Sequence, residues 1–171
     1  GEEPWKFDNT LGHSLVTFEI IGQMLKNNKI DYGMLWNTRW MQDRNPDSIW
    51  YALGSQNELL PPGRILAIWG EFLKDKLIHI DRTEKIVTFA SMDSNNCEIS
   101  LFLLNKGYTE ENLSVAVKGD NFNNAKVFCY SGKAAQDTQP EWKLKDNSSI
   151  SENMIKGVSL PPVSLTVISL C

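Results

Sequence analysis

The chain has 171 residues, of which 42% are hydrophobic and 22% are charged, a composition that indicates a globular protein with a hydrophobic core. The formal net charge is −4 without a cluster of Lys and Arg, which argues against nucleic acid and anionic membranes as partners. The longest apolar stretches, 99–104 and 163–170, are far shorter than the ~20 residues that cross a bilayer.

The first part of the chain is predicted to alternate between helix and strand. Apolar residues recur at three- and four-residue spacings over 9–28, which indicates an amphipathic helix. The short apolar run 30–36 has the length of a buried strand. The polar and aromatic segment 37–57 is a long loop, and loops of this length tend to be functional. A second amphipathic helix is predicted over 62–74, opened by prolines that a first turn tolerates.

From residue 76 onward the pattern changes to short strand-like runs, separated by turns rich in Asn, Asp and Gly. Seven strands are predicted, over 77–80, 86–91, 98–104, 113–117, 125–130, 141–144 and 164–170. Strands at a spacing of about ten residues indicate an antiparallel β-sandwich. The expected fold class is therefore α+β, with one part over 1–75 and the sandwich over 76–171. A single strand cannot form a sheet with covered edges, so the first part must complete something larger.

Four segments in this order resemble the end of a clan A glycoside hydrolase, most closely the patterns of families 39, 51 and 79 and of agarase-like enzymes. They are Trp36-Asn37-Thr38-Arg39-Trp40, Asn57-Glu58-Leu59-Leu60-Pro61-Pro62-Gly63, Trp69-Gly70-Glu71-Phe72-Leu73 and the final Leu160-Pro161-Pro162-Val163. The resemblance implies that 9–28 is the seventh helix, 30–36 the eighth strand and 62–74 the eighth helix of a (β/α)₈ barrel. The chain would then be the terminal helix–strand–helix portion of the barrel, followed by the antiparallel β-sandwich.

The resemblance also implies that the catalytic residues lie elsewhere. In these families the catalytic pair consists of two Glu residues, after the fourth and seventh barrel strands, and neither strand is found in this sequence. Glu2 and Glu3 form the only acidic pair near the expected position, but no apolar run precedes them. We interpret them as solvated terminal charges, with a catalytic nucleophile as the alternative. This chain alone is expected to be inactive and to need an N-terminal barrel portion, as a separate chain or upstream segment.

Barrel enzymes bind substrate at the carboxyl ends of their strands, which directs attention to Trp36, Asn37, Arg39 and Trp40 as substrate-binding residues. An indole ring packs on the C–H face of a sugar, while amide and guanidinium groups donate hydrogen bonds to its substituents. Core packing remains open for Trp36, a structural salt bridge for Arg39, and either role for Trp40. Trp50 and Tyr51 are expected to pack within the loop, with an outer sugar subsite as the alternative.

Other chemistry has little support in the sequence. Cys97, Cys129 and Cys171 lack the spacing of a metal site and are expected to be free thiols, with one disulfide as the alternative. His13 and His79 are assigned structural roles, and no metal or cofactor is expected. A non-catalytic carbohydrate-binding or structural assembly module is the competing interpretation of the chain. The resemblance implies a secreted or extracytoplasmic protein, although no signal peptide is expected within these residues.

Overall fold

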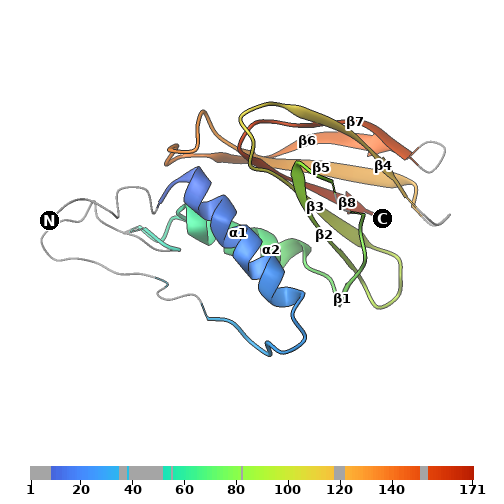
Figure 1. Cartoon of the computed structure of the whole chain (residues 1–171), viewed down its shortest axis with the longest axis horizontal. Coiled ribbons are helices and arrows are strands. Elements are labelled where there is room, and N and C mark those ends of the chain that lie inside the picture. Colours follow the sequence, from blue (N-terminus) through green and yellow to red (C-terminus); the bar gives the residue numbers. More distant parts are fainter. Residues whose placement is uncertain are drawn as a thin grey trace, which may run out of the picture. The chain divides into compact units, whose positions relative to one another are not determined.

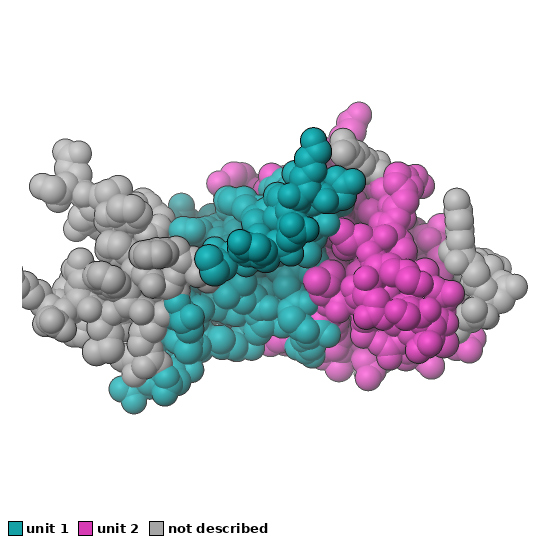
Figure 2. All heavy atoms as spheres, turned by 90° about the horizontal axis from the view of Figure 1, so that it is seen from below, with its two compact units in different colours: residues 1–71, 132–140 teal, residues 72–131, 141–171 magenta. Residues whose placement is uncertain are grey.

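The computed structural model describes residues 9–34, 38, 52–54, 56–81, 83–117, 122–150 and 154–171, and within them no helix is long and apolar enough to cross a membrane (Figure 1). The chain divides into two compact units, coloured separately in Figure 2. Unit 1 comprises residues 1–71 and 132–140, and unit 2 comprises 72–131 and 141–171. The division into parts 1–75 and 76–171 stays a prediction.

The described residues of unit 1 include two helices, and both were predicted with bounds that differ by one to three residues. Helix α1 covers Leu11–Leu25 and helix α2 covers Pro61–Phe72. Thr10 caps α1, because its backbone is extended and its hydroxyl accepts a hydrogen bond from the His13 N–H at 3.3 Å. Helix α2 begins at a proline, whose missing N–H would have no partner in a first turn.

The core of unit 1 is built on an aromatic pair. The rings of Phe18 and Trp69 stack with centroids 4.4 Å apart, and the Trp69 indole N–H donates to the Phe18 carbonyl oxygen at 3.4 Å. Stacked rings of this kind contribute about 0.5–1.5 kcal/mol beyond their burial. Four aliphatic side chains complete this core, namely Leu11, Leu15, Ile65 and Ile68. The predicted core role of Trp69, which is 4% exposed, is confirmed.

The predicted strand 30–36 is not formed over its described part. Residues 30–34 are exposed and have no regular secondary structure, and 35–36 lie outside the described residues. The apolar run suggested a buried strand, but a strand forms only where at least one neighbouring strand pairs with its backbone N–H and C=O groups. The described residues of unit 1 provide no such neighbour for this segment.

Unit 2 is an antiparallel sandwich of a large and a small sheet. The large sheet has the order β1-β2-β3-β8-β5-β6, and the small sheet pairs β4 with β7. The strands are β1 (Lys76–Leu77), β2 (Ile86–Met92), β3 (Ile99–Asn105), β4 (Glu111–Ala116), β5 (Asn124–Ser131), β6 (Glu141–Ser149), β7 (Met154–Leu160) and β8 (Ser164–Leu170). A buried cluster that includes Leu101, Leu103, Ile155, Leu160 and Ile168 forms its core. The expected fold class, α+β with an antiparallel sandwich, is confirmed.

Strand β7 was missed in the sequence because a bulge breaks its alternation. Leu113 of β4 pairs with Val158, whereas Val115 pairs with Ile155, so β7 has an extra residue at this point. Gly157 lies there with a φ of +70°, a conformation that glycine adopts without steric cost. Ile155 and Val158, two of the three buried side chains of β7, are therefore three residues apart, which disrupts a period of two.

The expected free thiols are confirmed, because none of the three cysteines forms a disulfide. Cys129 is buried, whereas Cys97 and Cys171 are exposed. Strand β1 is shorter than predicted, with only Lys76 and Leu77 paired to β2. His79 follows it, with its imidazole Nε2 3.6 Å from the Asp81 carboxylate and both side chains exposed.

Candidate functional site

The six predicted site residues lie outside the described residues. They are the substrate-binding candidates Trp36, Asn37, Arg39 and Trp40 and the acidic pair Glu2 and Glu3. Trp50 and Tyr51 lie outside them as well. The structure does describe segment 30–34 before the Trp36–Trp40 corner, Thr38 within it, and residues 52–54 and 56–60 after it.

A small hairpin stands where the chain returns from the long loop. Leu53 and Leu59 pair as an isolated antiparallel bridge, and the Gly54 N–H donates to the Glu58 carbonyl oxygen at 2.9 Å. Asn57 turns the chain with a φ of 64°, which Asn tolerates better than most residues. The hairpin is thus closed by its own backbone, without help from a regular sheet.

This hairpin is hydrogen-bonded to the corner itself. The Leu53 N–H donates to the Thr38 carbonyl oxygen, 3.0 Å away. Thr38 is the middle residue of the Trp36–Trp40 corner, so the backbone at that point is held against the start of the hairpin. Thr38 and Leu53 consequently lie next to each other, although they are fifteen positions apart in sequence.

The hairpin rests in turn on the first turn of α2. The Leu60 N–H donates to the Ala52 carbonyl oxygen at 3.0 Å, and the Arg64 N–H donates to the Leu60 carbonyl oxygen at 2.9 Å. A Cβ added to Gly63 would overlap the Ala52 carbonyl oxygen. The glycine of the Pro61-Pro62-Gly63 sequence therefore permits close backbone contact between helix and hairpin.

Glu58 is an exposed carboxylate near the corner that the sequence analysis did not single out. One of its carboxylate oxygens, Oε2, accepts a hydrogen bond from the Gln56 N–H at 2.8 Å, and the carboxylate lies over the Cα of Gly54. Glu58 belongs to the segment Asn57-Glu58-Leu59-Leu60-Pro61-Pro62-Gly63, which carries part of the family resemblance. From the sequence alone, this glutamate looks like a residue of an ordinary turn, because the bridge between Leu53 and Leu59 is seen only in the structure.

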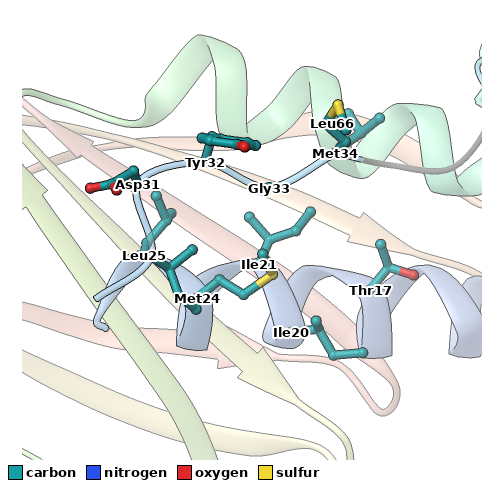
Figure 3. Close-up of a pocket in the computed structure, with 11 residues that line it drawn as sticks. Thr17, Ile20, Ile21, Met24, Leu25, Asp31, Tyr32, Gly33, Met34 and Leu66 are labelled. Atoms are coloured by element: carbon teal, nitrogen blue, oxygen red, sulfur yellow. The ribbon is translucent and has the colours of Figure 1, made fainter. Parts of the chain in front are cut away.

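An apolar groove of about 460 Å³ runs between α1 and segment 30–34 (Figure 3). Ile21 and Met24 line it from α1, Tyr32 and Met34 from the segment, and Leu66 from α2. Among the described lining residues, only Asp31 carries a carboxylate, and its side chain points outward from the segment in Figure 3. This lining can bury apolar surface but offers no pair of groups for acid–base chemistry. Within the described residues, no cluster of three or more His, Cys, Asp or Glu could hold a metal ion.

The fold is similar to solved structures from three glycoside hydrolase families. A family 30 endoxylanase from Clostridium papyrosolvens C71 has a TM-score of 0.71 and 12% identity, over 96% of this chain and 39% of that chain. A family 44 xyloglucanase from Paenibacillus polymyxa has a TM-score of 0.71 and 16% identity, over 95% and 30%. A family 51 α-L-arabinofuranosidase from Thermotoga petrophila RKU-1 has a TM-score of 0.72 and 10% identity, over 94% and 38%.

No protein-family model matches the sequence, and no curated protein sequence matches it. The identities to the solved structures are low, so the likeness concerns the fold. Family 51 is among those that the sequence resembles, whereas families 30 and 44 were not anticipated. The chain spans 30–39% of the length of the four solved structures that head the comparison. Its fold is similar to that of a portion of these clan A glycoside hydrolases, in agreement with the resemblance.

Proposed function

We propose that this chain is the C-terminal portion of a glycoside hydrolase that acts on a polysaccharide or oligosaccharide. The observation that carries the proposal is that one alignment covers 94–96% of the chain, both helices and sandwich together, in enzymes of three hydrolase families. Those proteins are named as an endoxylanase, a xyloglucanase and an arabinofuranosidase, so the substrate class is carbohydrate. A polysaccharide too large to enter a cell favours a secreted or extracytoplasmic enzyme.

The chain supplies one wall of the sugar-binding cleft in this proposal. Trp36 packs on the C–H face of a sugar, while Asn37 and Arg39 donate hydrogen bonds to its hydroxyls or to an acidic substituent. The hydrogen bond from Leu53 to the Thr38 carbonyl supports this role, because a fixed backbone positions the neighbouring side chains. The catalytic Glu pair belongs to the preceding part of the barrel, about 5–5.5 Å apart for retention or ~6.5–9.5 Å for inversion.

The competing interpretation, a non-catalytic carbohydrate-binding module, loses support. Such a module needs an aromatic platform on the sandwich, where Trp142 is the one tryptophan. Its ring stacks on Phe128 with centroids 5.4 Å apart and meets the edge of Phe72 at 5.8 Å. Trp142 is therefore engaged in packing within unit 2.

Native material tests the proposal directly. The protein purified from its source is weighed intact and assayed on xylan, xyloglucan and an arabinofuranoside, with the 171-residue chain alone as the control. We expect hydrolysis only where about 30–45 kDa of additional polypeptide is present, in the same chain or bound to it, because a complete barrel needs roughly 250 residues. A folded 19.4 kDa protein that exists without further polypeptide would contradict the proposal.

A further inference from the structure

Glu58 carries a carboxylate that its own hairpin holds in place. Its Oε2 accepts a hydrogen bond from the Gln56 N–H at 2.8 Å. The carboxylate also lies over Gly54, where a Cβ would overlap it, so glycine leaves the room that the carboxylate occupies. Gly54 is buried, whereas Glu58 is exposed. An exposed glutamate ordinarily samples many rotamers, but a carboxylate that is fixed by a backbone N–H is already in position for a ligand.

The same carboxylate keeps most of its capacity to accept hydrogen bonds. Within the described part of the chain, its Oε1 accepts no hydrogen bond, and neither Lys nor Arg forms an ion pair with Glu58. A carboxylate offers about four lone-pair sites to donors, and the Gln56 N–H uses one of them. Glu58 therefore presents negative charge and open acceptor sites to whatever binds beside the hairpin.

The hairpin connects this carboxylate to the Trp36–Trp40 corner through two consecutive residues. Leu53 donates its N–H to the Thr38 carbonyl oxygen at 3.0 Å, and Gly54, the next residue, lies under the Glu58 carboxylate. Consecutive Cα atoms are about 3.8 Å apart, so the carboxylate lies on the order of 10 Å from that carbonyl oxygen. All of these residues belong to unit 1. A ligand held at the corner would therefore have Glu58 as a neighbour.

We infer that Glu58 is a specificity-determining residue of the sugar-binding cleft, an inference that rests on the proposed function. Its carboxylate accepts hydrogen bonds from the hydroxyl groups of a sugar unit that is bound next to the corner. The same negative charge repels an acidic substituent such as the carboxylate of a uronic acid. The cleft is thus selective for uncharged sugar units at this position. Of the two ligands proposed for Arg39, the hydroxyl groups are favoured over the acidic substituent.

The test uses the complete enzyme and the polysaccharide that it hydrolyses fastest, in an uncharged and in a partly carboxymethylated form. The measured quantity is the ratio of kcat/KM for the uncharged form to that for the charged form. Glu58→Gln removes the charge but keeps an oxygen that can accept from the Gln56 N–H. We expect this substitution to lower the ratio about three- to tenfold, because like charges a few ångströms apart repel by this order at a protein surface. Salt at about 1 M should lower the wild-type ratio as well, since it screens exposed charges.

Glu71→Gln is the matched control, because it makes the same change of charge at an exposed position of α2. Its ratio should equal that of the wild type. A complete enzyme that hydrolyses the polysaccharide with the same ratio in Glu58→Gln as in the wild type would overturn the inference and leave the proposed function standing. An equal fall in Glu71→Gln would overturn it too, since the effect would then be one of net charge. A complete enzyme that hydrolyses no polysaccharide would overturn the proposed function and this inference with it.

Discussion

Two glycines of the same helix have opposite surroundings. A Cβ at Gly63 would overlap a backbone carbonyl oxygen of Ala52, whereas a Cβ at Gly70 would meet nothing within 4 Å. Gly63→Ala is expected to destabilise the protein by about 1–3 kcal/mol, since backbone atoms must move to admit the methyl group. Gly70→Ala should stabilise it by about 0.5–1 kcal/mol through helix propensity. Urea unfolding of both variants measures the difference, and equal effects would contradict the close contact.

Asn105 joins three segments of the sandwich through one buried amide. Its Nδ2 donates to the carbonyl oxygens of Thr109 and Pro161 at 2.9 Å and of Leu160 at 3.1 Å, and its Oδ1 accepts from the Gly107 N–H at 2.9 Å. The residue is 1% exposed. The asparagine of the Asn105-Lys106-Gly107 turn is thus a structural residue of the sandwich.

Asn105→Leu should therefore destabilise the protein strongly. The substitution leaves buried carbonyl and N–H groups without a partner, and each such group costs about 1–3 kcal/mol. Asn112→Leu is the control, because Asn112 is exposed and its amide lies 3.5 Å from the Glu110 carboxylate. Thermal unfolding of both variants is the measurement. A midpoint for Asn105→Leu as high as that for Asn112→Leu would refute the structural role.

At the scale of elements, helix α1 begins on a loop that is distant in sequence. The N–H groups of Leu11 and Gly12 donate to the carbonyl oxygens of Asp137 and Ala135, both at 2.8 Å. The first N–H groups of a helix have no partner inside it, so this loop acts as a cap. The Asp137 carboxylate closes the loop, accepting from the Lys133 N–H at 2.8 Å and the Gln139 N–H at 2.9 Å.

These two backbone N–H groups, that of Lys133 before that of Gln139, hold the pKa of Asp137 below its ordinary value of 3.8. A carboxyl group whose pKa is lower in the folded than in the unfolded protein stabilises the fold at any pH above its unfolded-state pKa. This stabilisation is lost as the pH falls through its folded-state pKa. Asp137→Asn should therefore unfold at lower urea concentration than the wild type at neutral pH. The gap should close well below pH 3.8.

Asp31→Asn is the control for this titration, since it makes the same change of charge at an exposed position. Its unfolding midpoint should stay close to that of the wild type at neutral pH. If the gap for Asp137→Asn were as wide in acid as at neutral pH, the carboxylate would not be the group that holds the loop.

The sequence predicts those helices and strands whose apolar residues recur with a regular period. It does not predict elements that depend on pairing with a neighbouring strand. The stripe of Leu11, Leu15 and Phe18 predicted α1 because helical period and burial agree. Strand β7 was lost at Gly157, where a bulge interrupts the alternation. The run 30–36 has the composition of a strand, but residues 30–34 have no neighbouring strand among the described residues.

For the candidate site, the sequence indicated a corner but not its support. The Trp36–Trp40 corner was chosen for residue chemistry and its place after an apolar run. The hairpin that is hydrogen-bonded to Thr38 could not be predicted from the sequence. The hydrogen bond from the Leu53 N–H joins residues on either side of a long loop, and no periodic pattern of residues indicates it. Glu58 was overlooked for the same reason, because its place depends on that hairpin.

At the scale of the whole molecule, the described residues of unit 2 form a buried apolar cluster, whereas unit 1 has an apolar groove between α1 and segment 30–34. The central strands β3 and β8 of the large sheet are buried along almost their whole length. Among its described residues, unit 1 contains two helices and the segment 30–34, which has no regular secondary structure. In the proposed function, a preceding barrel portion supplies the catalytic carboxylates.

The contribution of the corner to catalysis is measurable in the complete enzyme. Trp36→Ala should lower kcat/KM by about fivefold, mainly through a higher KM, because loss of a ring that stacks on a sugar costs on the order of 1 kcal/mol. Trp50→Ala is the matched control. Trp50 is expected to pack within the loop, so its loss should lower the unfolding midpoint and leave KM for the sugar nearly unchanged. A reversal of these two patterns would assign core packing to Trp36 and sugar binding to Trp50.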